Sequence, residues 1–283
     1  MRILVTNDDG IDSEGLHVLA RALRQHGDVT IIAPDDEYSG ASGALGAIHL
    51  IQPEVHRADV EGVEKAWSVT GPPALCVMFS RLGAFGPPFD LVVSGINPGA
   101  NVGRSVYHSG TVGAALTARA GGISGVAVSQ AVVGFGVEGQ GWDEMLRGQN
   151  WEGAAEVAAA VIGGLIEAAP KSPVVINVNV PNLRVPDMAG WQRTAIGRVP
   201  PRAISEAVLE PKLGHPGTFR VAMRWGDAVS LPEGTDGGAI ERNLVSITML
   251  GSLTDVDADR DVSAEEAAQE GVAAALDKLF AAG

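Results

Sequence analysis

The first half of the chain alternates between short apolar runs and longer amphipathic segments. Residues 2–6 (RILVT) form an apolar run that is typical of a fully buried strand. In residues 13–26, leucine and alanine side chains recur at the i, i+3, i+4 and i+7 positions that form one face of a helix. Residues 28–33 (DVTIIA) are a second strand candidate, ended by a proline. A strand, a helix and a strand in this order predict parallel pairing with a right-handed crossover.

The same alternation continues along the chain. Helices are expected at residues 72–83, 110–122 and 151–169, and further strands at residues 89–95, 124–130 and 172–181. Strands and helices that alternate at this spacing indicate an α/β fold. We therefore predict a Rossmann-like, open and mostly parallel sheet with helices on both faces, formed by residues 1–182.

The pattern changes after Pro181. Three segments have the pattern of antiparallel strands or long hairpins, namely residues 190–199, 218–226 and 243–250. We predict that residues 183–283 form an extension with hairpin arms, a returning strand and a C-terminal helix at residues 263–280, used in oligomerisation. Core and extension are expected to make up one domain. Residues 137–148 are the best candidate for a surface loop.

Composition and charge exclude several classes of function. The 283 residues, 46% of them hydrophobic, are enough for a sizeable core. A formal net charge of −14 argues against binding to a nucleic-acid duplex. Asp8 and Asp9 fall where a signal peptide would be apolar, and no uncharged apolar run reaches the roughly 20 residues of a membrane helix. The single cysteine, Cys76, is expected to be a buried thiol. We expect a cytoplasmic protein without a membrane partner.

Polar residues gather where the expected parallel strands end. Asp8 and Asp9 directly follow the first strand, and residues 35–42 and 94–103 follow two others. In open α/β sheets, ligands bind outside the carboxyl ends of the strands. Adjacent carboxylates repel each other, and a divalent cation relieves that repulsion. Oxygen ligands without a His/Cys cluster favour Mg²⁺ or Mn²⁺ over zinc. The alternative is that NDDG is a plain turn with a capping aspartate.

The segment HSGTVGAA, residues 108–115, indicates an anion site at a helix N-terminus. Ser109 and Thr111 lie at the start of the expected helix, where free backbone N–H groups attract negative charge. The alternative is an ordinary cap on a helix of small residues. His108 is a candidate general acid for a leaving group, or else a wall residue. An anion site beside a metal site favours a phosphate ester as the substrate.

Together these stretches resemble the SurE family, the stationary-phase survival 5′/3′-nucleotidases. The matching segments occur in the family's order and run from Ile3 to Thr248. They are ILVTNDDGIDSEGL (3–16), APDDEYSGAS (33–42), SGINPGANVG (94–103), SGTVGAA (109–115), INVNVP (176–181) and TDGGAIERNLVSIT (235–248). The combination is far more specific than any one member.

The resemblance implies metal-dependent hydrolysis of nucleoside monophosphates by a metal-activated water, with one Mg²⁺ or Mn²⁺ per subunit. The implied metal ligands are Asp8, Asp9, Ser39 and Asn97, of which the two aspartates are also the catalytic candidates. The implied phosphate-binding residues are Asn101, Ser109, Gly110 and Thr111. The resemblance further implies a homodimer or homotetramer in which C-terminal segments exchange between subunits.

Two alternatives to this function remain open. The chain departs from the family's usual residues at Asp36, Tyr38, Thr117 and Ala118. These departures are compatible with a nucleotide-binding or regulatory protein that has weak or no turnover. The second alternative is a phosphatase with an aspartyl nucleophile, which also carries aspartates after its first strand. That type uses Asp-x-Asp spacing, whereas the pair here is adjacent.

Overall fold

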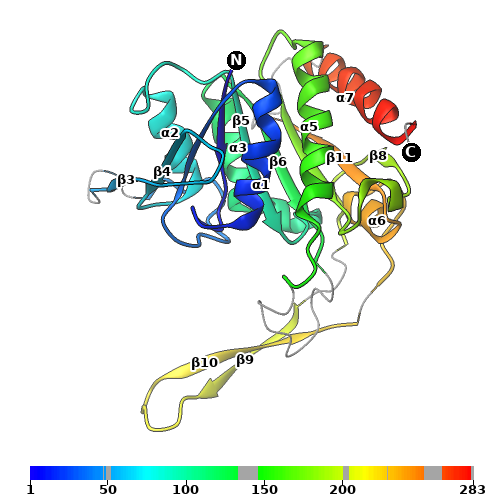
Figure 1. The fold of residues 1–283 in the computed structure, drawn as a ribbon. Helices are drawn as coiled ribbons and strands as arrows, with labels where there is room; N and C mark the ends of the chain where they lie inside the picture. The colour runs from blue at the N-terminus through cyan, green and yellow to red at the C-terminus, as the bar shows by residue number, and fades with distance from the viewer. Residues whose placement is uncertain are drawn as a thin grey trace, which may run out of the picture.

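The computed structural model describes residues 1–46, 48, 52–132, 146–199, 204–227, 229–251 and 263–281. Most of the expected surface loop at residues 137–148 lies outside these ranges. Figure 1 shows a central sheet with helices packed against it and one hairpin that projects from the body. Within the described ranges, no helix is long and apolar enough to cross a membrane.

Nine strands of the described residues form one sheet, in the order β3-β4-β2-β1-β5-β6-β7-β11-β8. The strands are β1 (Arg2–Thr6), β2 (Asp28–Pro34), β3 (Val55–Arg57), β4 (Lys65–Val69), β5 (Leu91–Pro98), β6 (Ser124–Gln130), β7 (Val175–Val180), β8 (Trp191–Arg193) and β11 (Val245–Leu250). The run from β4 to β7 is parallel throughout, whereas β3 and β11 are antiparallel to their neighbours β4 and β7. This topology confirms the predicted α/β fold.

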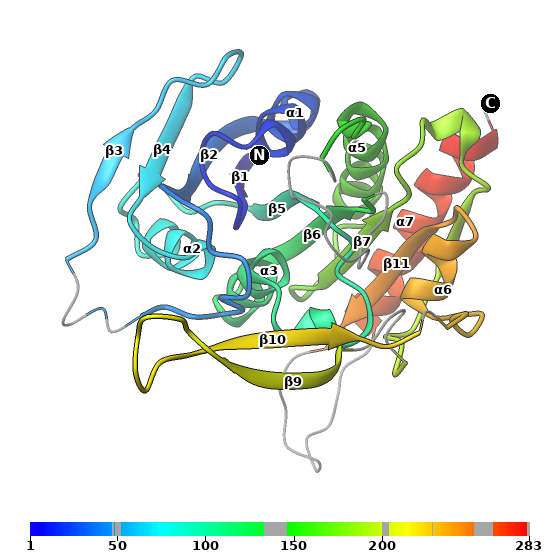
Figure 2. The same cartoon turned by 90° about the horizontal axis from the view of Figure 1, so that it is seen from below.

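Helices cover both faces of the sheet, as Figure 2 shows. The α-helices are α1 (Glu14–Leu23), α2 (Pro73–Arg81), α3 (Gly110–Ala120), α5 (Trp151–Ala168), α6 (Asp236–Glu241) and α7 (Ser263–Ala281). Short 3-10 helices are η1 (Arg24–His26), η2 (Gly103–Tyr107) and η3 (Val185–Asp187). Helices α1 and α5 pack on one face and α2 and α3 on the other, while α7 packs on α5.

Burial on both faces explains why three consecutive residues of β1 are apolar. Ile3 and Val5 belong to the apolar cluster that includes side chains of α1 and α5. Leu4 points to the opposite face, into the cluster that includes side chains of α2 and α3. All three side chains are completely buried. A strand in the middle of a doubly covered sheet therefore shows a continuous apolar run instead of alternation.

The C-terminal part of the chain returns to the sheet. Strand β11 pairs with β7, and β8 pairs with β11. The antiparallel strand expected at residues 190–199 is wrong, because only Trp191–Arg193 form a strand and this strand is parallel to β11. Beyond it, Ala195 donates its backbone N–H to the carbonyl of Gly234 and accepts the N–H of Asp236. These bonds turn the chain toward α6 and end the strand.

A separate hairpin consists of β9 (Ile204–Pro211) and β10 (Phe219–Trp225). The two strands are antiparallel, and the hairpin projects away from the central sheet (Figure 1). Strand β10 matches the expectation for residues 218–226. The hydrophobic pattern did not predict β9, whose charged residues interrupt its apolar ones.

Helices α5 and α7 approach each other closely through glycines. A Cβ atom on Gly164 would lie 2.4 Å from the carbonyl oxygen of Gly271. A Cβ atom on Gly271 would lie 2.6 Å from both the Gly164 carbonyl oxygen and the Cβ of Ala168. Real Cβ atoms do not tolerate such distances, so this contact requires glycine on both helices.

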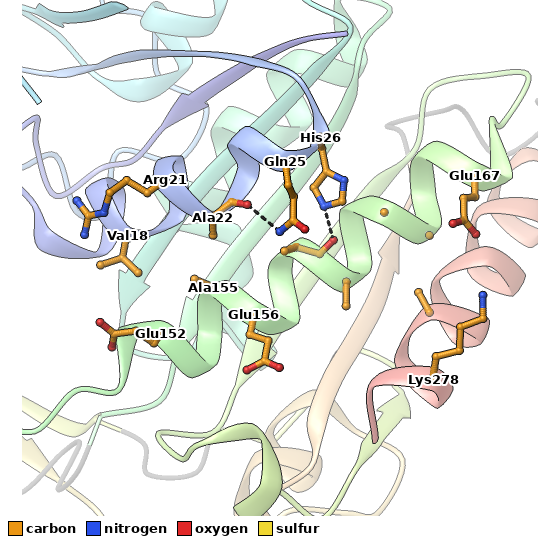
Figure 3. Close-up of a pocket in the computed structure, with 15 residues that line it drawn as sticks. Val18, Arg21, Ala22, Gln25, His26, Glu152, Ala155, Glu156, Glu167 and Lys278 are labelled. Carbon is orange, nitrogen blue, oxygen red and sulfur yellow. Dashed lines mark hydrogen bonds between the residues drawn. The ribbon is translucent and has the colours of Figure 1, made fainter. Parts of the chain in front are cut away.

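A surface hollow of about 620 Å³ lies over α1, α5 and α7 (Figure 3). Arg21 and His26 line it from the side of α1, Glu152 and Glu156 from α5, and Lys278 from α7. It is a groove between helices on one face of the sheet, and it contains none of the polar residues that follow the parallel strands.

The glycine contact predicts a specific loss of stability. We expect Gly271→Val to lower the free energy of unfolding by about 1–3 kcal/mol, because the added side chain overpacks the contact with α5. Ala274→Val, at an exposed position of the same helix, is expected to cost only about 0.5 kcal/mol through helix propensity. Urea titrations of both variants measure the difference. Equal losses would contradict the close approach of the two helices.

Candidate functional site

The carboxyl end of β1 leads into a tight turn that holds Asp8 and Asp9. The Asn7 side chain donates a hydrogen bond from Nδ2 to the carbonyl of Gly10, at 2.9 Å. Gly10 has a φ of +95°, which side chains rarely adopt. The next residue, Ile11, donates its N–H to the carbonyl of Pro34 at the end of β2. The NDDG segment therefore turns the chain at the carboxyl end of β1, the end of a parallel sheet where ligands generally bind.

Asp8 faces the N-terminus of α3. Its side chain is only 2% exposed, and its Oδ1 accepts a hydrogen bond from the Thr111 hydroxyl at 2.5 Å. A Cβ atom on Gly110 would lie 2.7 Å from Oδ2 of Asp8, so only glycine admits the carboxylate here. Burial raises the pKa of Asp8, and hydrogen bonds from the Thr111 hydroxyl and from the backbone of Thr111 and Gly110 oppose that rise. The start of α3 therefore binds negative charge already supplied by the protein.

Asp9 lacks comparable partners. Its Oδ2 atom is buried and has no hydrogen-bond partner among the described residues. Its pKa lies well above the ordinary value of 3.8, first because of burial and then because of the negative charges of Asp8 and Glu37. A buried carboxylate oxygen without a partner is costly. A bound cation would give this oxygen a partner and would relieve the repulsion between the neighbouring carboxylates.

The loop after β2 joins the β1 turn to α3. Tyr38 donates its backbone N–H to the Asp8 carbonyl at 2.7 Å, and Ser42 donates its own to the His108 carbonyl at 3.1 Å. A Cβ atom on Gly113 would lie 2.0 Å from the Ser42 carbonyl oxygen, so the loop rests directly on α3. Ser39 lies between these anchors and is exposed.

The remaining predicted residues lie at the end of β5 and in the segment after it. Asn97 is half-buried, and its Nδ2 donates to the Gly99 carbonyl at 2.6 Å. His108 directly follows η2 and has an exposed side chain. Ser109 is the N-cap of α3, and its hydroxyl oxygen accepts the N–H of Val112 at 3.1 Å. The ordinary capping interpretation thus describes Ser109 correctly.

Asn101 is buried and is hydrogen-bonded to side chains of strands β6 and β7. Its N–H donates to Oδ1 of Asn179 at 2.7 Å, and its Nδ2 donates to the Ser129 hydroxyl at 2.9 Å. Its carbonyl accepts from Nδ2 of Asn177 and of Asn179. These three partners were not predicted to belong to the site. For the two asparagines, the sequence signals are their alternation with apolar residues and the place of INVNVP among the segments that resemble the family.

A second hollow, of about 290 Å³, opens beside Asp9. Asp12, Glu14 and Glu37 line it together with Trp151, so its wall carries several carboxylates. The described residues contain no group of three or more His, Cys, Asp or Glu side chains placed to hold a metal ion. A cation at Asp8 and Asp9 would therefore need hydroxyl, amide, carbonyl or water oxygens to complete its ligands. Such ligands suit Mg²⁺ or Mn²⁺.

Comparison with known proteins defines the family. The family model described as Survival protein SurE matches residues 3–202, a range that includes every predicted site residue. The crystal structure of the SurE protein from Aquifex aeolicus is similar, with a TM-score of 0.71 and 28% sequence identity. The match covers 90% of this chain and 95% of that one. The chain belongs to the SurE family, a family of phosphatases and nucleotidases.

The electrostatics predict that Asp9 destabilises the metal-free protein at neutral pH. Because the folded pKa is raised, the unfolded chain ionises first as the pH rises above 3.8. Stability is then lost until the folded carboxyl group also ionises. We expect Asp9→Asn to raise the free energy of unfolding at neutral pH, in EDTA, by roughly 1–3 kcal/mol.

Urea titrations across a pH series measure this effect. The gain should be absent at pH values below the ordinary pKa and should grow as the pH rises. Asp59→Asn, at an exposed position in the β3–β4 connection, is the matched control and should change little at any pH. A gain that does not depend on pH would contradict the electrostatic explanation.

Proposed function

We propose that the protein is a metal-dependent phosphomonoesterase that hydrolyses nucleoside monophosphates, a 5′/3′-nucleotidase. The observation that carries the proposal is the buried, unpartnered Oδ2 of Asp9, directly beside an Asp8 that faces the N-terminus of α3. Two adjacent carboxylates without a compensating positive charge, next to a helix N-terminus, suit a divalent cation together with a phosphate group. Family membership supports the same class of reaction.

Asp8, Asp9, Ser39 and Asn97 would hold the metal, one Mg²⁺ or Mn²⁺ per subunit. When bound, the ion would polarise a phosphoryl oxygen and lower the pKa of a water nucleophile. The hydrogen bond from Thr111 fixes the orientation of the Asp8 carboxylate. A side chain held in this way loses little conformational freedom when a ligand binds.

The first turn of α3 would bind the phosphate. Gly110 and Thr111 lie at its N-terminus, and Ser109 caps it. The hydroxyls of Ser109 and Thr111 and the positive end of the α3 dipole would stabilise negative charge that develops on the phosphoryl group. Asn101, which is held by strands β6 and β7, would border the same pocket. The exposed His108 remains a candidate proton donor to the leaving group.

The departures from the family pattern do not favour loss of turnover. Thr117 donates its hydroxyl to the Gly113 carbonyl within α3, and Ala118 is completely buried in the apolar cluster. Tyr38 contacts Asp8 through its backbone N–H, which any residue except proline supplies. Of the four departures, only Asp36 adds charge near the site. An active enzyme is therefore favoured over a regulatory protein without turnover.

Phosphate release tests the proposed activity. We expect the protein with Mg²⁺ or Mn²⁺ to release phosphate from 5′-AMP or 3′-AMP, and EDTA to abolish the release. Asp8→Asn keeps a hydrogen-bond acceptor for Thr111, so the fold should persist while the rate falls by about 100-fold or more. Asp59→Asn should behave as wild type. Metal-independent release that survives Asp8→Asn would overturn the proposal, and an aspartyl-phosphate trapped with beryllium fluoride would overturn the water mechanism.

We also propose that the protein forms a homodimer or homotetramer through its C-terminal segments. Leu209, Phe219, Val221 and Met223 are all more than half exposed, and strand pairing places them on one face of the β9–β10 hairpin. The other face carries charged pairs such as Arg224 and Glu206, 3.4 Å apart. An isolated hairpin is marginally stable in water. Contact with a second copy of the chain would cover its apolar face.

The hairpin face predicts a change in assembly. We expect Val221→Lys to lower the molar mass measured by light scattering, because the charge enters the apolar face. Ala222→Lys introduces the same side chain one residue later, on the opposite face, and should leave the mass unchanged. A monomeric wild type, or equal masses for both variants, would show that this face is not the interface.

A further inference from the structure

Asp236 is a second buried carboxylate, distinct from the pair at β1. It is the first residue of α6 and has no exposed surface. Its Oδ2 accepts the N–H of Gly103 at 2.8 Å. Its Oδ1 accepts the N–H groups of Gly197, at 2.9 Å, and of Gly237, at 2.8 Å. One carboxylate thus connects three backbone segments that are far apart in the sequence.

The bond to Gly103 fixes the beginning of η2. Gly103 has a φ of +57°, and a Cβ atom there would lie 3.2 Å from the Gly197 carbonyl oxygen. The 3-10 helix that starts at this residue ends at Tyr107, immediately before His108 and the first turn of α3. Gly103 therefore lies on the short connection between Asn101 and the N-terminus of α3.

Few other side chains hold this connection. Arg104, Ser105, Tyr107 and His108 are exposed, whereas Val106 is buried. Asn101 is anchored before the connection by its strand partners, and Thr111 is anchored after it by Asp8. The bond from Gly103 to Asp236 lies between these two anchors. It ties this turn to the buried start of α6, in addition to the buried Val106 side chain and the bond from Ser42 to the His108 carbonyl.

Asp236 is itself held in place by its surroundings. Its backbone N–H donates to the Ala195 carbonyl at 2.9 Å. Thr235 caps α6 by accepting the N–H of Gly238 at 3.1 Å. The carboxylate therefore has a fixed position before it binds Gly103. A fixed acceptor that meets a glycine N–H can set the position of the segment that the glycine begins.

We propose that Asp236 is a positioning residue for the phosphate side of the site, acting through Gly103 on residues 101–111. This inference rests on the proposed function for its catalytic consequence, since Asp236 does not contact the carboxylate pair in the structure. It assigns to α6, in the C-terminal part of the chain, a role in arranging a site built by the N-terminal part.

The substitution Asp236→Asn tests the proposal because it breaks one particular bond. An amide has a single acceptor oxygen, so its Nδ2 must face either Gly103 or the two N–H groups at the Oδ1 position. The orientation in which Nδ2 faces Gly103 is favoured, because it loses only the bond to Gly103, whereas the other orientation loses the bonds to both Gly197 and Gly237. We expect the KM for 5′-AMP and the inhibition constant for inorganic phosphate to rise together, by about tenfold. The rise in melting temperature on adding Mn²⁺ should persist, because Asp8 and Asp9 are unchanged.

Thr235→Ala is the matched control, since it weakens the N-cap of the same helix but leaves the bond to Gly103 intact. It should lower the melting temperature without changing KM or phosphate inhibition. If both variants lose stability and neither changes KM or phosphate inhibition, Asp236 has only a structural role and the proposal is wrong.

Hydrogen exchange separates this inference from the proposed activity. Amides of residues 103–111 should exchange about tenfold faster or more in Asp236→Asn than in Thr235→Ala, whatever reaction the protein catalyses. Equal exchange in the two variants would overturn the inference even in an active enzyme. If the wild type releases no phosphate, the proposed function fails, and the exchange measurement alone decides whether Asp236 positions this segment.

Discussion

The close contact between Asp8 and the first turn of α3 is the interaction on which the rest of the site depends. It joins two elements that are more than a hundred residues apart in the sequence. The contact exists because Gly110 has no side chain, so the carboxylate can reach the helix N-terminus. The contact also determines the position of the loop after β2, because Tyr38 bonds to the Asp8 carbonyl and Ser42 packs against α3.

This contact also makes the two adjacent carboxylates unequal. Asp8 receives hydrogen bonds and the favourable potential of a helix N-terminus, whereas the buried Oδ2 of Asp9 has no partner among the described residues. The fold therefore stabilises one negative charge and leaves the second uncompensated. Proteins often accept such local instability where a ligand will bind, because the ligand then supplies the missing interaction.

The sequence predicted the parts of the structure that depend on local pattern. Strands β1, β2, β5, β6 and β7 and the helices packed on them followed from apolar runs and helical spacing, and the polar strand ends followed from the parallel topology. Strands β3 and β4 at the edge of the sheet were not predicted. Asn177 and Asn179 were not predicted as part of the site, because their partner Asn101 lies more than 70 residues away in the sequence. The contact between Asp236 and Gly103 was missed for the same reason. Strand β8 was predicted wrongly because the turn toward α6 depends on backbone bonds to Gly234 and Asp236.

The asparagines of β7 have a consequence for how the chain folds. Ile176 and Val178 point into the large apolar cluster, while Asn177 and Asn179 point to the opposite face and are completely buried there. A slip of β7 by one residue would exchange these faces and bury both amides in an apolar environment without partners. The two asparagines therefore specify the register of β7 relative to its neighbours β6 and β11. A uniformly apolar strand would allow several registers.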